Sequence, residues 1–272
     1  MPKISVNDQE IYYEVHGEGY PLLMIQGYAG TSESWDIITP GRIGDLSKHN
    51  KVIIFDNRGA GRSSAPPGPI SIRMMADDAA GLLDALRIPK ANVLGESMGG
   101  MIAQELAINH PEKVKNLILV CTFPGGPTMD SIKGMRKAIE KVSWYTSPPP
   151  GMPLEAAMSE IYGMCFFPRF FEENRARILA SSVKYPVPDS TLEKQYDAIM
   201  SFNAYPRLSE IKSKTLVIHG ASDELIMPEG GRMLAKLISG ARLVMVEEAS
   251  HDVLDEKWGE VKPVILNFLS QD

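Results

Sequence analysis

Residues 94–100 read LGESMGG, and this stretch decides how the rest of the chain is interpreted. The apolar run ANVL leads into it as a predicted strand, and MGGMIAQELA leads out of it as a predicted helix. A serine between glycines in a strand-turn-helix setting is typical of a nucleophile elbow, a tight turn that exposes the serine oxygen. We therefore expect Ser97 to be strained, with its two flanking glycines relieving crowding where strand and helix approach closely.

Eight short runs of apolar, often β-branched residues predict the strands of the fold. They are ISV (4–6), IYYEV (11–15), PLLMI (21–25), KVIIF (51–55), ANVL (91–94), NLILVC (116–121), TLVIH (215–219) and RLVMV (242–246). The first two flank Asn7-Asp8-Gln9 and predict an antiparallel hairpin. The last six are nearly unbroken apolar runs, which suits strands buried on both faces of a parallel sheet.

Helix-like stretches alternate with these strands. The clearest are SIRMMADDAAGLLDALRI (71–88), MIAQELAINHPEKV (101–114) and VLDEKWGEVKPVILNFLS (253–270). Alternation of this kind indicates an α/β fold with right-handed crossovers. The prediction is a mostly parallel, eight-stranded twisted sheet with helices on both faces.

One long interval breaks the alternation. No strong strand run lies between Cys121 and Thr215, and a structureless loop of about 90 residues is improbable in a compact domain. The interval instead holds helix-like pieces punctuated by Pro and Gly. We therefore expect a core made of residues 1–123 and 206–272, with an inserted helical cap at 124–205.

Composition and charge exclude several classes of protein. The formal net charge is −6 and no run of Lys or Arg forms a basic patch, so a nucleic-acid or anionic-membrane partner is not expected. No apolar stretch approaches the 18 or so residues of a membrane span, and MPKISVNDQE lacks the apolar region of a signal peptide. Cys121 and Cys165 are too few for a disulfide scaffold and lack metal-ligand spacing. We expect a reduced, cytoplasmic chain without a metal site.

Ser97 needs partners before it can act as a nucleophile. A serine hydroxyl is activated by an adjacent base, usually histidine, which a carboxylate orients. In a parallel α/β sheet such groups gather at the carboxyl ends of the strands. Asp223 follows the strand TLVIH, and His251 follows the last strand, RLVMV, whereas His219 lies inside a strand run and suits a structural role. The expected triad is Ser97, Asp223 and His251, although an aspartate such as Asp223 is also common as a helix cap.

An enzyme of this kind also needs donors for the oxyanion. The N–H of Met98 stands at the start of the helix after the serine, where the helix dipole favours negative charge. The loop QGYAGTSESW after PLLMI supplies a second candidate, the N–H of Tyr28.

The substrate pocket is the least defined part of the prediction. Gly27, Phe123 and Trp144 are the candidate pocket residues. The aromatic and Met residues of the inserted segment favour an apolar substrate chamber, although most of them could simply hold cap helices against the core.

Further motifs carry a family resemblance that runs almost end to end. DNRGAGRSSAPP (56–67), HGASDELIMP (219–228) and EEASHDVLDE (247–256) join GESMGG in resembling the α/β-hydrolase fold family, and the chain order Ser, Asp, His matches its order. The helical segments look like the esterase and 3-oxoadipate enol-lactonase-like branch. The resemblance implies a serine hydrolase acting on small or medium, mainly apolar esters or lactones, without a metal or organic cofactor.

Two departures from the family pattern stand beside this resemblance. Gln26-Gly27 occupies a position where the family often has His-Gly, and Ser250-His251 one where it often has Gly-His. The first puts the hydrogen bonding of the oxyanion loop in question. Other functions on the same scaffold stay open: C–C bond hydrolysis, aminopeptidase activity, cofactor-free perhydrolysis, or ligand reception without turnover.

The GAGRSS turn and Glu96 each allow more than one interpretation. GAGRSS (59–64) resembles a dinucleotide-binding turn, but the prolines that follow prevent a helix from starting there, so Asp56 and Arg58 are interpreted as structural. Glu96 stands directly before the nucleophile. It either points beside the pocket, disfavouring anionic substrates or raising the pKa of the imidazole, or is a solvated or ion-paired side chain.

Overall fold

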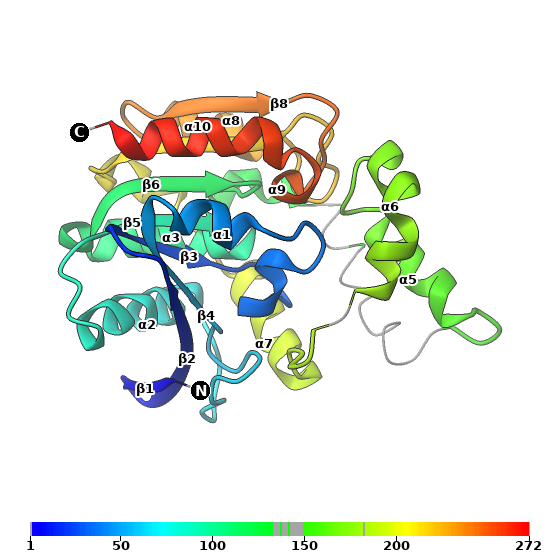
Figure 1. Ribbon diagram of the computed structural model, residues 1–272, viewed down its shortest axis with the longest axis horizontal. Helices are drawn as coiled ribbons and strands as arrows, with labels where there is room; N and C mark the ends of the chain where they lie inside the picture. Colours follow the sequence, from blue (N-terminus) through cyan, green and yellow to red (C-terminus); the bar gives the residue numbers. More distant parts are fainter. Residues whose placement is uncertain (1, 133–136, 138–140, 142–148, 182, 272) are drawn as a thin grey trace.

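The computed structural model describes residues 2–132, 137, 141, 149–181 and 183–271. Its centre is an eight-stranded sheet in the order β1-β2-β4-β3-β5-β6-β7-β8 (Figure 1). The strands are β1 (Lys3–Val6), β2 (Gln9–His16), β3 (Tyr20–Ile25), β4 (Asn50–Phe55), β5 (Ala91–Glu96), β6 (Val114–Val120), β7 (Lys214–Gly220) and β8 (Arg242–Val246). Each of the eight predicted runs corresponds to one strand, so the predicted sheet is confirmed.

The direction of the strands places their carboxyl ends together. β1 pairs antiparallel with β2 and β2 with β4, whereas all pairs from β4 through β8 are parallel. The register sets Ile25 beside Gly95, Glu96 beside Val120, and Gly220 beside Val246. The loops that follow β3, β5, β6, β7 and β8 therefore emerge from the same edge, called the carboxyl edge below.

Helices cover both faces of the sheet. One buried apolar cluster joins the sheet to α2 (Ile72–Ala85), α3 (Met98–Asn109) and α8 (Glu229–Leu237). A second joins the opposite face to α1 (Arg42–Ser47), α9 (Val253–Glu256) and α10 (Trp258–Ser270), and Figure 1 shows α1 and α10 on the near side. This is the predicted layer arrangement.

Local chemistry explains where two of the helices begin and end. The Ser71 hydroxyl accepts a hydrogen bond from the Met74 amide at 3.1 Å and caps α2. α3 ends at Asn109 because Pro111 disfavours a helical conformation at His110, and Pro111–Lys113 form a 3-10 turn. The helix predicted at 101–114 is therefore too long at its carboxyl end.

The C-terminal helix differs from its prediction. The apolar pattern predicts one helix over 253–270, but the structure has α9 and α10, separated at Lys257 with φ −129° and ψ 33°. The break coincides with tertiary contacts of the preceding turn, where the Glu256 carboxylate accepts the amides of Ser250 and Phe167. The local pattern cannot reveal such contacts.

The described residues between β6 and β7 include the α-helices α5 (Leu154–Tyr162), α6 (Pro168–Ala180) and α7 (Asp189–Met200). α5 and α6 stand beyond the carboxyl edge of the sheet in Figure 1. A separate apolar cluster of Phe166, Phe171 and Ile178 packs them against Ile38. The division at residues 124 and 205 stays a prediction. None of the helices in the described ranges combines the length and apolarity that a membrane span needs.

Candidate active site

Ser97 occupies the sharp turn between β5 and α3 with φ 55° and ψ −120°, the strained conformation that its flanking glycines predict. Its backbone is fixed on both sides, because its amide donates to the Val120 carbonyl at 2.9 Å and its carbonyl accepts the Thr122 hydroxyl at 2.8 Å. A Cβ on Gly99 would overlap the carbonyl oxygen of Ile25. The close approach of strand and helix therefore requires glycine there.

Asp223 and His251 come from different loops and meet at the carboxyl edge. Asp223 follows β7, and its Oδ1 accepts the amides of Leu225 and Ile226, each at 2.9 Å. Its Oδ2 lies 2.9 Å from His251 Nδ1. Since a carboxylate accepts the Nδ1 proton, the other ring nitrogen of His251, Nε2, is left available as a base.

The electrostatics of this pair favour a charged carboxylate beside an imidazole with raised proton affinity. Burial opposes charge on Asp223, but the His251 charge and hydrogen bonds from His219 and His251 outweigh it and lower the Asp223 pKa. Burial likewise acts to lower the pKa of His251, and the Asp223 carboxylate reverses this, so that the pKa is raised. The geometry thus places Ser97, Asp223 and His251 at one edge, all of them less than a tenth exposed.

The loop after β3 approaches Ser97 closely. A Cβ on Gly27 would lie 3.0 Å from Ser97 Cβ and 3.5 Å from its Oγ, so the predicted pocket residue Gly27 borders the nucleophile. In the described part of the chain, the amides of Tyr28 and Met98 donate to no protein acceptor. Their role as oxyanion donors stays a prediction.

Gln26, the departure from the family pattern, has a defined position. Its Oε1 accepts the Gly27 amide at 2.8 Å, and a Cβ on Gly30 would lie 2.9 Å from the same oxygen. Its backbone carbonyl accepts the Asn57 amide group at 3.0 Å. The side chain therefore braces the loop and occupies the Gly27 N–H, leaving the next amide, that of Tyr28, free.

The other two predicted pocket residues differ in outcome from Gly27. Phe123 has no exposed surface, and its ring packs edge-on against Phe202 at 6.2 Å between centroids. It belongs to the buried apolar core, and a Cβ on Gly230 of α8 would lie 2.8 Å from Phe123 Cβ. Its role as a pocket residue stays a prediction. Trp144 lies outside the described residues.

Glu96 is buried with 7% of its surface exposed, so the solvated interpretation is wrong. Side chains alternate along a strand, and Glu96 shares the face of Leu94, toward α1 and α9. Burial and the Asp255 carboxylate raise its pKa to about 7, against the opposing charges of Arg42 and His251. Among the residues that the structure describes, Glu96 Oε1 has no hydrogen-bond partner.

His219 also contacts the predicted acid, a role that sequence reasoning missed. Its Nε2 lies 3.2 Å from Asp223 Oδ2, and its ring is fully buried. The signal was present, because His219 ends a predicted strand only four residues before Asp223. A residue inside a strand run is nevertheless normally interpreted as core.

One trio of side chains brings possible metal ligands together: Cys121, His219 and Asp223, whose ligand atoms lie within 4.8 Å of one another. These atoms are already engaged or neutral. Asp223 accepts hydrogen bonds on both oxygens, and burial, with the Asp223 charge adding to it, raises the pKa of the Cys121 thiol well above its ordinary value. A thiol that stays protonated is a poor metal ligand.

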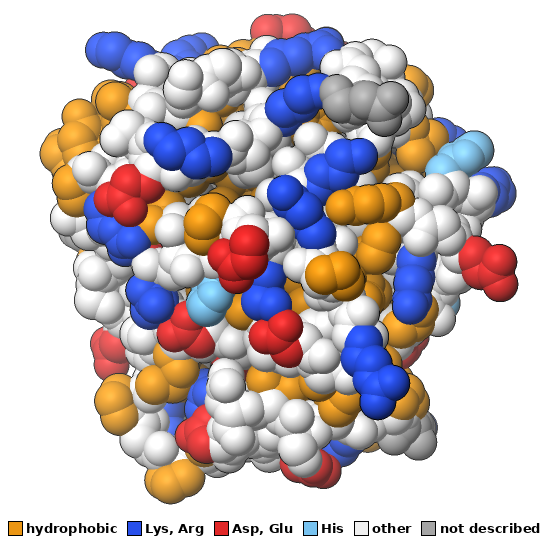
Figure 2. Space-filling model, turned by 90° about the vertical axis from the view of Figure 1, so that its left-hand side faces the viewer, with side chains coloured by type: hydrophobic (Ala, Val, Ile, Leu, Met, Phe, Trp, Pro, Cys, Tyr) orange, Lys and Arg blue, Asp and Glu red, His pale blue; other side chains and the backbone are white. Residues whose placement is uncertain are grey.

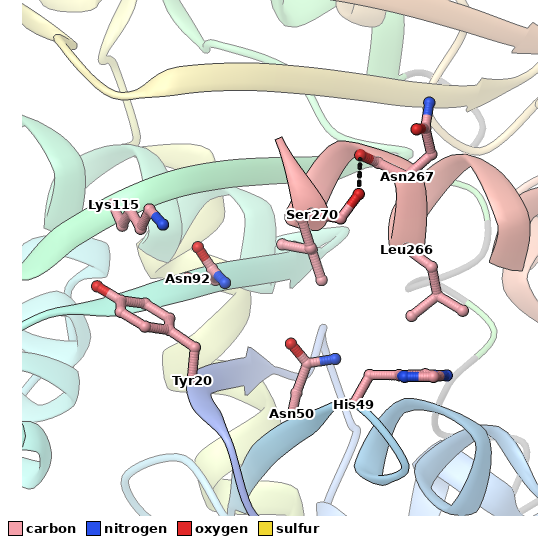
Figure 3. A pocket seen from close by; sticks show the side chains of 9 residues that line it. Tyr20, His49, Asn50, Asn92, Lys115, Leu266, Asn267 and Ser270 are labelled. Carbon is pink, nitrogen blue, oxygen red and sulfur yellow. Dashed lines mark hydrogen bonds between the residues drawn. The ribbon is translucent and has the colours of Figure 1, made fainter. Parts of the chain in front are cut away.

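A hollow of about 430 Å³ lies at the opposite, amino edge of the sheet (Figure 3). Its lining comprises Tyr20, His49, Asn50, Asn92, Lys115, Leu266, Asn267, Leu269 and Ser270. On this side of the molecule, acidic and basic side chains are interspersed (Figure 2). Because Tyr20 and Asn50 begin β3 and β4, the hollow is separated from Ser97 by the length of the sheet.

Several known proteins resemble this chain along nearly its whole length. Residues 20–257 match the model of the α/β hydrolase fold family. A putative carbamate hydrolase RutD from Azorhizobium caulinodans is 31% identical over 254 residues, covering 92% of this chain and 91% of that protein. A 2-hydroxymuconate semialdehyde hydrolase from Pseudomonas sp. strain CF600 is 29% identical and covers 94% and 88%. The enol-lactonase from Burkholderia xenovorans LB400 superimposes with a TM-score of 0.82 at 28% identity, covering 99% and 100%.

Proposed function

The chain belongs to the α/β-hydrolase fold family, and from that premise we propose that it is a serine hydrolase of small to medium, mainly apolar carboxylic esters or lactones. Ser97 is the nucleophile, His251 the general base and Asp223 the residue that orients it. The observation that carries the proposal is the 2.9 Å contact between Asp223 Oδ2 and His251 Nδ1 at the edge where Ser97 turns outward. The enol-lactonase likeness supports the substrate class.

The first half of the reaction forms an acyl-enzyme. His251 Nε2 takes the proton of Ser97 Oγ as that oxygen attacks the carbonyl carbon of the ester. The negative oxygen of the tetrahedral intermediate accepts hydrogen bonds from the amides of Tyr28 and Met98. Neither amide donates to a protein group in the described ranges. Protonated His251 then gives its proton to the leaving alkoxide, and the acyl group stays on Ser97.

The second half repeats these steps with water. His251 removes a proton from the water as its oxygen attacks the acyl carbon. Protonated His251 then gives that proton to Ser97 Oγ as the tetrahedral intermediate collapses and releases the acid. In a lactone the alkoxide and the acyl group belong to one molecule, so the product is a hydroxy acid. Every proton in this scheme moves through His251, and the reactants are the chain's own groups, the substrate and water.

A carbamate is the second candidate substrate. The putative carbamate hydrolase RutD covers 92% of this chain at 31% identity. A carbamate ester presents the same kind of carbonyl to Ser97, so the mechanism is unchanged apart from the leaving group. Hydrolysis of another bond on the same triad, as the semialdehyde hydrolase likeness suggests, is a further alternative.

A serine-directed probe tests the proposal whatever the natural substrate is. We expect the wild type to react with a fluorophosphonate and to hydrolyse 4-nitrophenyl acetate and butyrate, and Ser97→Ala to lose labelling and at least about 10³-fold in kcat. Ser270→Ala is the matched control, because that hydroxyl only donates to the Asn267 carbonyl within α10.

The substrate arms of the same experiment separate the alternatives. Esters of graded chain length, alkyl lactones and aryl carbamates are compared by kcat/KM at one pH. Preference for apolar esters or lactones supports the main proposal, and preference for carbamates favours the second. A wild type that neither labels at Ser97 nor turns over any member of the series refutes serine-hydrolase function.

A further inference from the structure

The carboxylate of Asp223 contacts two imidazole rings. Its Oδ2 lies 2.9 Å from His251 Nδ1 and 3.2 Å from His219 Nε2, while Oδ1 accepts the amides of Leu225 and Ile226. The mechanism proposed above uses only the first of these rings. The second, at the end of β7, is without an assigned role.

The contacts of His219 define its protonation. Its Nε2 lies 2.8 Å from the carbonyl oxygen of Ile226, and because a carbonyl can only accept, Nε2 carries a hydrogen. That hydrogen is shared between the carbonyl and Asp223 Oδ2. The ring is fully buried, and Nδ1 has no partner within the described ranges, so a second proton there would be a buried charge without an acceptor. His219 is therefore a hydrogen-bond donor through Nε2.

We propose that His219 is a positioning residue, whose Nε2–H holds the Asp223 carboxylate with Oδ2 facing His251. This inference rests on the proposed serine-hydrolase function. An N–H donor stabilises the ionised carboxylate and so makes it less basic. Removing the donor makes Asp223 hold the His251 proton more tightly, and the pH at which His251 becomes a free base rises.

The imidazole ring of His219 packs directly against Gly231 in α8. A Cβ on Gly231 would lie 2.6 Å from His219 Nδ1, closer than real Cβ contacts allow. A methyl group at this position must therefore push the ring, which gives a second way to disturb the same contact without removing the imidazole.

Other charged groups around His251 stay constant in this comparison. The carboxylates of Asp252 and Glu96 act on the imidazole, which in turn acts on Glu256, and the Cys121 thiol lies beside His219 and Asp223. None of these groups is altered by a substitution at His219 or Gly231. A shift in the pH at which His251 becomes a free base in such variants therefore reports the loss or displacement of the His219 Nε2–H.

The experiment measures the rate of fluorophosphonate inactivation against pH for the wild type, His219→Leu and His219→Gln. Leucine fills the site without an N–H, and we expect the midpoint to rise by roughly half a unit to one unit, with a three- to tenfold lower rate at pH 7. Glutamine can place an amide N–H near the position of Nε2, and we expect it to return the midpoint toward the wild-type value.

Gly231→Ala provides the second arm and does not depend on the folding of the leucine variant. We expect it to move the midpoint in the same direction as His219→Leu. Gly259→Ala in α10 is its matched control, because an added Cβ there meets no atom within 4 Å.

Each outcome decides the inference. An unmoved midpoint in His219→Leu and Gly231→Ala overturns it, as does an equal loss of rate in the leucine and glutamine variants at a wild-type midpoint, which indicates a packing role. A wild type that shows no Ser97-dependent inactivation refutes the proposed function itself. A normal wild type with unmoved variant profiles refutes only the positioning role.

Discussion

Two clusters of charge in this molecule, each built around a buried carboxylate, follow opposite principles. The first, here named the hairpin cluster, comprises Arg58, Asp78, Asp8, Asn7 and Gln9. Arg58 Nε and Nη2 lie 2.8 Å from the two oxygens of Asp78, and Nη2 also lies 2.8 Å from Asp8. Asn7 and Gln9 donate one further hydrogen bond to each Asp78 oxygen. Both oxygens of the buried carboxylate thus have a cationic partner and a further donor, although burial still raises the pKa of Asp78.

The second, named the acid cluster, comprises Glu96, Asp252, Asp255 and Glu256 with the single guanidinium of Arg42. Arg42 Nη1 pairs with Asp255 at 3.0 Å, which leaves three carboxyl groups without a basic partner inside the cluster. Burial raises the pKa of Glu256 to about 7 and that of Asp252 well above its ordinary value. These groups surround the loop that carries His251.

The two clusters contribute differently, the first to stability and the second to the surroundings of the predicted site. A compensated buried pair holds β1, β2, α2 and the turn after β4 together, and loses heavily when one partner is removed. Uncompensated carboxyls beside an imidazole cost stability and are typical of functional sites. The prediction that Arg58 is structural agrees with the first pattern, and the predicted site lies beside the second.

The largest expected effect comes from Asp223, whose carboxylate contacts His251. We predict that Asp223→Asn lowers kcat for ester hydrolysis about 10⁴-fold, because an amide facing Nδ1 favours the wrong imidazole tautomer, as the same change does in triad proteases. The melting temperature should change little.

The control for this change is Asp84→Asn, whose carboxylate is mostly exposed. It should leave both kcat and the melting temperature near the wild-type values. Retention of more than a tenth of kcat by Asp223→Asn contradicts the role assigned to that residue.

For a substitution in the hairpin cluster we expect the opposite, a large loss of stability with little change in reactivity. Arg58→Met leaves Asp78 buried without its cation, and we predict a loss of about 3–5 kcal/mol in the free energy of unfolding, measured by urea titration. Fluorophosphonate reactivity of the folded fraction should stay unchanged.

Two further variants test that prediction. Arg73→Met removes an exposed pair with Asp77 one helical turn away and should cost about 0.5 kcal/mol or less. The double variant Arg58→Met with Asp78→Asn should recover part of the loss, since no uncompensated charge remains. If Arg58→Met costs less than about 1 kcal/mol, compensation is not what stabilises this cluster.

Strand ends are the part of the molecule that sequence patterns predicted best. Unbroken apolar runs indicated parallel strands, and parallel strands bring Ser97, Asp223 and His251 to one edge whatever the loops between them do. The strain at Ser97 followed from the glycines around it. These inferences use only local pattern and the geometry of a sheet.

Features that depend on which way a side chain turns were out of reach. Phe123 follows β6 and resembles a pocket residue, yet its ring turns into the core against Phe202. Glu96 was open between a side chain beside the pocket and a solvated or ion-paired one, and strand alternation directs it toward α1 and α9. The break at Lys257 arises from contacts with distant loops. Tertiary packing decides the first and the last of these, whereas the direction of Glu96 follows from alternation in a strand that runs to residue 96.

The smallest expected effect is a change in how stability varies with pH, and it tests the acid cluster directly. The pKa of Glu96 is about 7 in the folded chain, above its ordinary value near 4.5, so the folded state binds this proton more tightly than the unfolded state does. Its contribution to stability is therefore present below about pH 4.5 and is lost as pH rises through about 7. Glu96→Gln should flatten the fall in stability between pH 5 and 7 by at most about 1.4 kcal/mol per pH unit, measured by urea titration across that range. Glu247→Gln, which removes an exposed carboxylate, is the matched control. A slope in Glu96→Gln equal to that of the wild type would contradict the raised pKa of Glu96.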